Sequence, residues 1–460
     1  MAKEKSQVNL RQTVSGTSLF ERGKQLRHTI PIEAHDRVVE SVERPGVLDF
    51  IDASNRGRLP HLIPLRIGRM VSSPFAFYRG SAGLMAADLA ASPVSGIEAQ
   101  LCGDAHAANF GLYGTPEGDI VMDINDFDET IVGPWEWDLK RLSTSLVLAG
   151  REGGVPDTEC VEAAEDAVKS YRRTIRELAQ QPFLQSWSAL PDQSVITRAK
   201  ADALLDDFAK AAKKASRNTS ARVAEKWTAH FDDHETGVKH RRFVEEPPTL
   251  TSVDADVADA VIDGLERYVD TLRESRRNLI GRYSVADVAF RIVGTGSVGL
   301  RSYVALLLGN TDEVLVLQIK QAQPSSLAPY LSAAEPSHEG KRIVHGARLV
   351  QAETDILLGW TTIDGIPYIV RQFRNLKGDI DPSALEADHL DDYGRLAGAL
   401  LARAHSRSLD PRLLSGYLAG DQELDEVIGR FAVRYADHVE ADHAVLAEAV
   451  RAGRMAAESG

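Results

Sequence analysis

One short glycine-rich segment constrains the fold of this 460-residue chain more than any other feature. Gly294-Thr295-Gly296-Ser297-Val298-Gly299 follows the apolar run AFRIV and therefore a predicted strand. A Gly-x-Gly-x-x-Gly segment either opens the helix of a dinucleotide-binding unit or joins two strands as a flap over phosphates. The turn sequence Gly309-Asn310-Thr311-Asp312 begins only ten residues later, which is short for a crossover helix. The pattern therefore favours a hairpin of two strands.

A lysine lies near the end of the next predicted strand. A dinucleotide-binding unit has an acidic residue at about that distance from the glycines, but VLQIKQA places Lys320 there. A lysine on this strand is typical of the layout in which it contacts the α- and β-phosphates of ATP. This argues against a dinucleotide-dependent oxidoreductase; the remaining structural alternative is a pair of glycine-rich hairpins with an edge lysine. The predicted nucleotide-binding residues are Gly294, Gly296, Ser297, Gly299 and Lys320.

A second polar group lies about two hundred residues earlier, in LCGDAHAANFG and the following run IVMDINDFDE. Phosphoryl transfer uses a carboxylate to orient or deprotonate the attacking hydroxyl, and an amide oxygen with a second carboxylate to hold Mg²⁺. Asp104 is the predicted base, and Asn109, Asp126 and Asp128 are the predicted ligands of Mg²⁺ or Mn²⁺. Asp123 remains a rival ligand, and solvated acids at a strand end are the alternative to a metal site.

Four further residues have open roles. His106 is a catalytic candidate, although packing within its loop is expected ahead of chemistry. Glu339 is the predicted acidic partner of Lys320; Glu335 is the alternative, but Pro336 separates it from the predicted helix. Arg79 beside a glycine suits phosphate or carboxylate recognition, and a surface ion pair is at least as good an explanation.

These motifs resemble those of a known family. Residues 103–109 resemble the His-Gly-Asp-x-His-x-x-Asn catalytic loop of aminoglycoside and choline phosphotransferases, which share the protein-kinase fold, with Cys102 in place of the first His. Residues 125–128 resemble the metal-binding strand of that family, and Asp138 resembles the buried aspartate that braces the catalytic loop. On SPFAFYRGSA, LCGDAHAANFG, NDFDET and GPWEWDLKRL, most of residues 20–440 resembles a bacterial domain-of-unknown-function family related to the kinases.

The motif order differs from that of an ordinary kinase, in which the glycine-rich loop and lysine precede the catalytic loop. Here residues 393–408 resemble the helix that normally precedes the catalytic loop. The resemblance therefore implies a circularly permuted, two-lobed α+β fold, with a largely helical C-lobe and a small antiparallel-sheet N-lobe. The expected parts are a polar leader (1–30), a C-lobe-like part (31–283), an N-lobe-like part (284–380) and returning C-terminal helices (381–460).

Helical spacing predicts helices over 157–181, 197–217 and 254–277, and the polar stretch 230–250 is a predicted loop. The helical insert over 151–280, with its 230–250 loop, is where we expect substrate contacts.

Charge and composition limit the partners. The formal net charge is -14, which argues against a protein that coats nucleic acid. The two cysteines rule out a disulfide framework, and without a long apolar run no membrane span is expected. A cytoplasmic protein without nucleic-acid or membrane partners is therefore expected.

The expected function is ATP- and Mg-dependent phosphoryl transfer to an unidentified small-molecule or protein acceptor. The alternatives are AMP transfer on the same fold and a nucleotide-binding pseudokinase with a regulatory role. The acceptor and the oligomeric state stay open.

Overall fold

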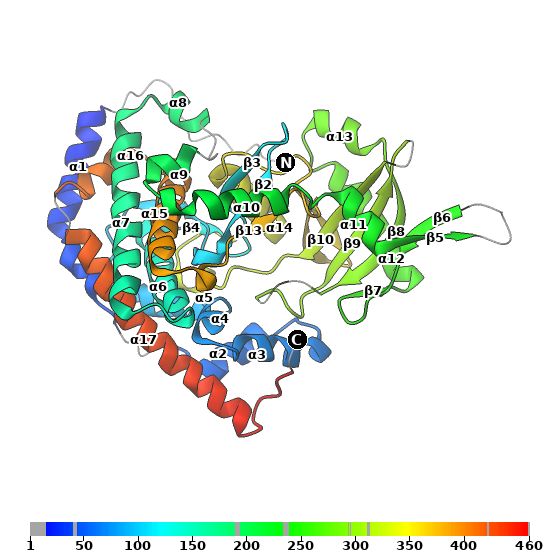
Figure 1. Ribbon diagram of the computed structural model, residues 1–460, viewed down its shortest axis with the longest axis horizontal. Coiled ribbons are helices and arrows are strands. Elements are labelled where there is room, and N and C mark those ends of the chain that lie inside the picture. Colours follow the sequence, from blue (N-terminus) through cyan, green and yellow to red (C-terminus); the bar gives the residue numbers. More distant parts are fainter. Residues whose placement is uncertain are drawn as a thin grey trace.

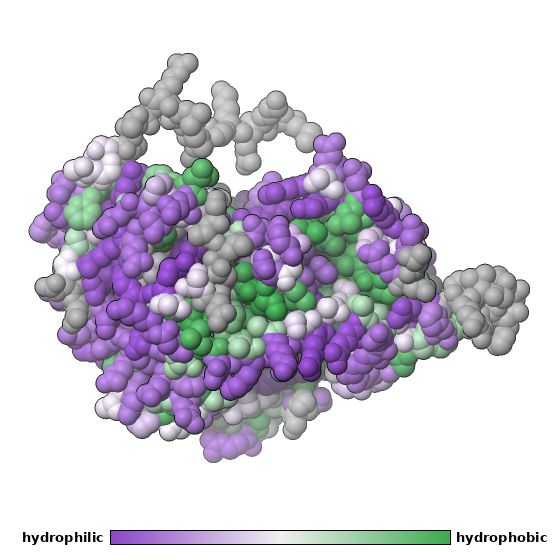
Figure 2. Space-filling view, turned by 45° about the horizontal axis from the view of Figure 1, so that its top comes forward, coloured by the Kyte–Doolittle hydropathy of each residue, from purple (hydrophilic) through white to green (hydrophobic). Residues whose placement is uncertain are grey.

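The computed structural model describes residues 15–39, 44–188, 194–232, 239–292, 294, 296–310, 313–420 and 423–458. Helices fill the left part of Figure 1, and an antiparallel sheet with its covering helices fills the right part. The predicted α+β class with antiparallel strands is confirmed. Within the described residues, no helix is long and apolar enough to cross a membrane. The face in Figure 2 is mostly hydrophilic, with smaller hydrophobic areas near its middle and over the sheet.

The helical part surrounds one buried helix. Its main members are α1 (Gly16–Thr29), α6 (Trp135–Glu152), α7 (Asp157–Gln180), α15 (Ala387–Ser406), α16 (Pro411–Tyr417) and α17 (Glu423–Arg451). Residues 135–150 of α6 are all buried, because α7, α15 and α17 pack around it. Helices α7 and α15 approach closely: a Cβ on Gly398 would lie 2.0 Å from the carbonyl oxygen of Ala167. The core of this part therefore depends on glycine at that crossing.

Shorter helices differ from the predicted ranges. The predicted helix 197–217 is divided into α9 (Ser194–Ala199) and α10 (Leu205–Ala215), with α8 (Phe183–Ser188) before them. Lys200 adopts a left-handed conformation with φ 59°, which ends α9 because such a backbone does not continue a helix. The predicted helix 254–277 is likewise two helices, α12 (Ala255–Val269) and α13 (Glu274–Ile280).

The large sheet has the strand order β11-β12-β10-β9-β8-β7, and every neighbouring pair is antiparallel. Its strands are β7 (Leu250–Ser252), β8 (Ser284–Arg291), β9 (Ser302–Leu308), β10 (Val314–Gln321), β11 (Gly359–Ile363) and β12 (Ile366–Gln372). The glycine-rich segment connects β8 to β9, so the predicted hairpin is confirmed. Lys320 sits near the end of β10, opposite Ser302 of β9 and Ile369 of β12.

Helices cover this sheet. Helix α12 packs on β11 and β8, α11 (Ser220–Trp227) packs on β10, and α14 (Glu339–Val350) packs on β12 and β11. The predicted loop 230–250 instead contains the paired strands β5 (Thr228–Asp232) and β6 (Lys239–Phe243); residues 233–238 lie outside the described residues.

Two small sheets hold the predicted catalytic loop and the acidic run together. Strand β1 (Glu98–Leu101) pairs with β4 (Ile131–Pro134), and β2 (Phe110–Gly114) pairs with β3 (Ile120–Ile124) and β13 (Gly378–Asp379). Leu101 is opposite Ile131, and Phe110 is opposite Ile124. Residues 102–109 and 125–130 are therefore two connections that leave and rejoin the same pairs of strands, and they lie side by side.

The N-terminal helices α2 (Val47–Ser54), α3 (Ile63–Met70), α4 (Pro74–Tyr78) and α5 (Ala82–Ala90) join both parts. The backbone N–H of Leu59 donates to the carbonyl of Gly299 at 2.8 Å, which ties this region to the glycine-rich hairpin. The N–H of Glu458, near the other end of the chain, donates to the carbonyl of Pro64 at 2.9 Å. A Cβ on Gly68 would lie 1.9 Å from the Glu458 carbonyl oxygen, so this contact is close.

Candidate functional site

Helix α6 holds the loop that carries Asp104 through the side chain of Asp138. The carboxylate of Asp138 accepts hydrogen bonds from the backbone N–H groups of Cys102 (2.8 Å) and Gly103 (3.0 Å). Gly103 has φ +81°, and a Cβ there would lie 2.2 Å from the carbonyl oxygen of Glu129. Only glycine fits this position, because the backbone is left-handed and the acidic run passes directly above it. Asp138 braces the loop, as expected.

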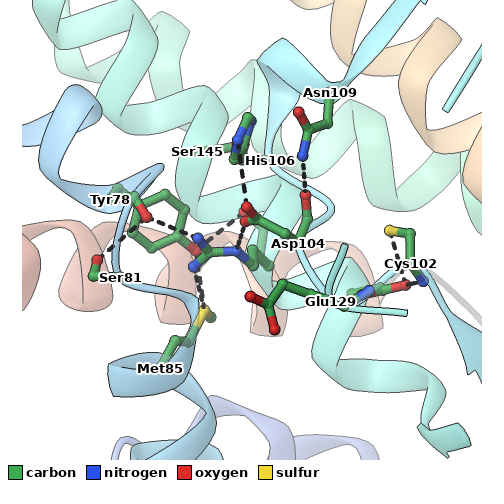
Figure 3. A network of polar contacts seen from close by, with 12 residues as sticks. Tyr78, Ser81, Met85, Cys102, Asp104, His106, Asn109, Glu129 and Ser145 are labelled. Atoms are coloured by element: carbon green, nitrogen blue, oxygen red, sulfur yellow. Dashed lines mark hydrogen bonds and ion pairs between the residues drawn. The ribbon is translucent and has the colours of Figure 1, made fainter. Parts of the chain in front are cut away.

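An arginine fixes the carboxylate of Asp104. Arg141 donates from Nε to Oδ1 of Asp104 at 2.5 Å and from Nη2 to the carbonyl of Tyr78 at 2.7 Å (Figure 3). Burial raises the pKa of Asp104 and the charge of Asp126 adds to this, against the opposing charges of Arg141 and Arg79. A positioned carboxylate with a raised pKa suits a group that accepts a proton.

His106 lies beside Asp104 but has little polar contact. Its Nε2 is 3.7 Å from Oδ2 of Asp104, and its ring meets Phe75 edge to face. Its Nδ1 is buried and has no hydrogen-bond partner among the described residues. Burial, with Arg79 and Arg141 nearby, holds the pKa of His106 well below its usual range, so the ring is neutral near pH 7. These contacts agree with packing within the loop.

Asn109 and the acidic run both present side-chain oxygen atoms to the same cavity. Asn109 donates from Nδ2 to the carbonyl of Asp104 at 2.7 Å, which leaves its amide oxygen as the free group. The backbone N–H of Asn125 donates to the carbonyl of Asn109 at 3.0 Å, which places Asp126 close by. Although burial opposes it, Lys320, Arg371 and Lys377 lower the pKa of Asp126.

The rival ligand Asp123 lies elsewhere. It is 4% exposed, and its Oδ2 accepts from the backbone N–H of Ala352 at 3.1 Å. Asp126 and Asp128 therefore remain as the carboxylates beside Asn109. Among the described residues, no group of three or more His, Cys, Asp or Glu side chains is arranged to hold a metal ion. One amide oxygen and one or two carboxylates still fit Mg²⁺, which usually completes its shell with water and phosphate oxygens.

Lys320 has a different partner from the predicted one. Its ammonium group contacts Oδ2 of Asp128, and although burial works against the charged form, Asp126 and Asp128 raise the pKa of Lys320. Glu339 instead accepts from Nε of Arg342 at 2.6 Å, one turn later on α14. Arg342 also donates to the backbone carbonyl of Asp128 at 2.8 Å. The predicted Lys320–Glu339 pair is therefore wrong, because Glu339 forms its ion pair with Arg342 and Lys320 forms its own with Asp128.

The glycine-rich segment closes the site from the sheet side. Gly294 and Gly299 have φ +63° and +87°, which favours glycine. Arg69 donates to the carbonyl of Gly294, and Arg58 donates from Nη1 to the carbonyl of Val298 at 2.5 Å. Thr295 lies outside the described residues.

One cavity of about 560 Å³ connects these elements. Its wall includes Asp104, His106, Asn109, Asp126, Asp128, Glu129, Gly294, Gly296 and Ser297. Gly299, Lys320 and Glu339 are not on this wall; Gly299 packs against Arg58, and Lys320 reaches the cavity through Asp128. The described residues of 151–280 do not line it, so the substrate contacts expected there are not found at this cavity.

The family model described as "Uncharacterized protein conserved in bacteria (DUF2252)" matches residues 58–449. The chain belongs to this family. No curated protein and no solved structure matches it. The DUF2252 match begins at Arg58 and includes both loops, the glycine-rich hairpin and Lys320.

Several site residues of this DUF2252 chain were not predicted from the sequence. Arg141, Arg58 and Arg66 belong to the site or its wall. Arg141 lies three residues after Asp138, one turn along α6, so the helical spacing there could have indicated it. Arg58 and Arg66 come from a region whose sequence shows no motif.

Proposed function

We propose that this chain is an ATP- and Mg-dependent phosphotransferase with a circularly permuted, kinase-like two-lobed fold. The observation that carries the proposal is the single cavity walled by Asp104, Asn109 and Asp126 on one side and by Gly294, Gly296 and Ser297 on the other. These residues come from distant segments, and their presence around one cavity supports a role in phosphoryl transfer, which uses residues of these types.

The permuted order has support at one point in the helical part. The backbone N–H of Gln100, on the strand that enters the catalytic loop, donates to Oγ of Ser408 at 2.8 Å. Ser408 lies two residues after the end of α15, the helix that resembles the one preceding the catalytic loop in kinases. His405 of α15 also lies 3.3 Å from Asp138. This proximity of the end of α15 to the strand that enters the catalytic loop supports the permuted order.

Each side chain has a defined part in the proposed reaction. Asp104 receives the proton of the acceptor hydroxyl, whose oxygen forms a bond to the γ-phosphorus while the bond to the β-phosphate oxygen breaks and ADP leaves. Asn109 and Asp126 hold Mg²⁺, which neutralises phosphate charge. Gly294, Gly296 and Ser297 cover the phosphates, and Lys320, which is not on the cavity wall, positions Asp128.

Calorimetric titration of ATP with and without Mg²⁺ tests the proposal. We expect Mg²⁺-dependent binding that Asp126→Asn weakens at least about tenfold, whereas Asp119→Asn, an exposed aspartate in the β2–β3 turn, leaves it unchanged. Equal binding with and without Mg²⁺ in both the parent and the Asp126 variant would contradict the site. Products formed from α- and γ-labelled ATP distinguish phosphoryl from AMP transfer, and binding without any ATP consumption would indicate a pseudokinase.

A further inference from the structure

Four arginines from the N-terminal part of the chain line the same cavity. They are Arg56, Arg58, Arg66 and Arg79. Acidic residues of 104–129 line it as well. Within the part of the chain that the structure describes, none of these arginines forms an ion pair with a carboxylate. The cavity is therefore lined by both carboxylates and arginines, and in the described structure no carboxylate lies within ion-pair distance of these four arginines.

Arg66 is the most buried of the four, at 1% exposed, and it projects from α3. Its Nη1 donates to the side-chain oxygen of Asn55 at 2.7 Å, whereas its Nε is buried without a hydrogen-bond partner among the described residues. Burial and the charge of Arg58 lower the pKa of Arg66 to about 9. A buried guanidinium without a carboxylate is costly to keep, which is the condition that a bound anion would relieve.

Arg79 occupies the space between the catalytic loop and the glycine-rich hairpin. It follows α4, its charge acts on both Asp104 and His106, and its Nε is also buried without a partner in the described structure. Its backbone carbonyl would be 3.6 Å from a Cβ on Gly296. Arg58 adds a third guanidinium, and burial lowers its pKa to about 10.

We propose that Arg58, Arg66 and Arg79 form a subsite for a phosphate-like oxyanion. Guanidinium groups present planar forks of N–H donors that match phosphate and carboxylate oxygens. The group held there belongs either to the terminal phosphate of the nucleotide or to an anionic acceptor. Its place in a reaction rests on the proposed function, whereas the anion binding itself rests on the arginines alone.

Titration of inorganic phosphate and pyrophosphate into the full-length protein without nucleotide is the direct test. We expect binding that Arg66→Met weakens about tenfold or more, since a charge-assisted hydrogen bond is lost. The unliganded Arg66→Met protein should melt at the same or a higher temperature than the parent, because the substitution removes an uncompensated buried charge. A purely structural arginine would instead lower the melting temperature. Arg79→Gln is the second variant, and Arg282→Gln, at an exposed position, is the control.

A second titration identifies the source of the anion. Phosphate that still binds to protein saturated with a non-hydrolysable Mg-ATP analogue indicates an anionic acceptor, and competition indicates the terminal phosphate. Absence of phosphate and pyrophosphate binding in the parent, or equal binding in the parent, Arg66→Met and Arg79→Gln, would overturn the subsite. Arginine-dependent phosphate binding without any Mg-ATP binding would instead refute only the proposed phosphotransferase.

Discussion

The ammonium group of Lys320 contacts the carboxylate of Asp128, although 192 residues separate the two in sequence. The Lys320 side chain is 4% exposed and that of Asp128 is 29% exposed. This contact joins the end of β10 in the large sheet to the acidic run beside the catalytic loop. It also places a positive charge beside the neighbouring carboxylates Asp126 and Asp128, which offsets their mutual repulsion.

Lys320→Met should therefore destabilise the fold. The variant removes the cation that contacts Asp128 and leaves Arg371 and Lys377 as positive charges near Asp126, and we expect the free energy of unfolding to fall by about 2 kcal/mol, between the values for exposed and fully buried pairs. Urea unfolding at pH 7 measures it. Adding Asp128→Asn to the variant should recover part of the loss, and an unchanged midpoint in Lys320→Met would contradict a stabilising pair.

Asp138→Ala tests how the catalytic loop is held. The substitution leaves the backbone N–H groups of Cys102 and Gly103 buried without their acceptor. We expect a loss of about 3 kcal/mol in unfolding free energy, since each unsatisfied buried donor costs about 1–3 kcal/mol. Urea unfolding checks the value, and a loss below about 0.5 kcal/mol would mean that the loop does not depend on this carboxylate.

Acidification should destabilise the protein because His35 is buried in its neutral form. His35 is fully buried, its Nε2 is 2.6 Å from the Tyr417 hydroxyl, and burial with the charge of Lys140 lowers its pKa to about 3. A lowered folded-state pKa gives stability that is present above the unfolded value of about 6.5 and is lost as the pH falls toward 3. We expect His35 to contribute a slope of about 1.4 kcal/mol per pH unit in that window.

Urea unfolding at pH 6.5, 5.5 and 4.5 measures this slope. His35→Asn should reduce the slope by about 1.4 kcal/mol per pH unit, which is the contribution of one proton. The same substitution at exposed His61 should leave the slope unchanged. Parallel pH profiles for His35→Asn and the parent would show that His35 does not cause the loss.

Arg69→Ala should loosen the glycine-rich hairpin without a large effect on global stability. The variant removes the donor to the carbonyl of Gly294. Because such a bond contributes about 1 kcal/mol, we expect amide hydrogen exchange over residues 296–300 to become about fivefold faster. Exchange measured by mass spectrometry checks this, with residues 139–148 of buried α6 as the internal reference.

Local patterns predicted the parts of the site that are local in sequence. The turn that soon follows Gly299 excluded a crossover helix, and the structure has β9 there. Asp138 at the start of α6 braces the loop, as the sequence predicted, through hydrogen bonds from the backbone N–H groups of Cys102 and Gly103. Helix boundaries were less well predicted where a single residue such as Lys200 takes a left-handed backbone.

Long-range partners could not be predicted in the same way. The sequence offers Glu335 and Glu339 as partners of Lys320 because a helix follows them, but the actual pairing depends on the position of Arg342, which contacts Glu339 and the backbone of Asp128. Arg58 and Arg66 likewise become part of the cavity only through the packing of α3 against the hairpin. Spacing along the sequence does not show which residues from distant parts of the chain become neighbours in space.

Three contacts attach the glycine-rich hairpin to residues 58–69: those from Arg58, from the N–H of Leu59 and from Arg69. The hairpin is thus unlike a free flap, because raising it alone would break all three. Moving the hairpin away from Asp104 and Asp126 would therefore either break these three contacts or carry α3 with it. Since the N–H of Glu458 donates to the carbonyl of Pro64 in α3, the segment after α17 is connected to the hairpin through α3, and a tag or truncation after α17 would change the mobility of the hairpin without touching a residue of the cavity wall.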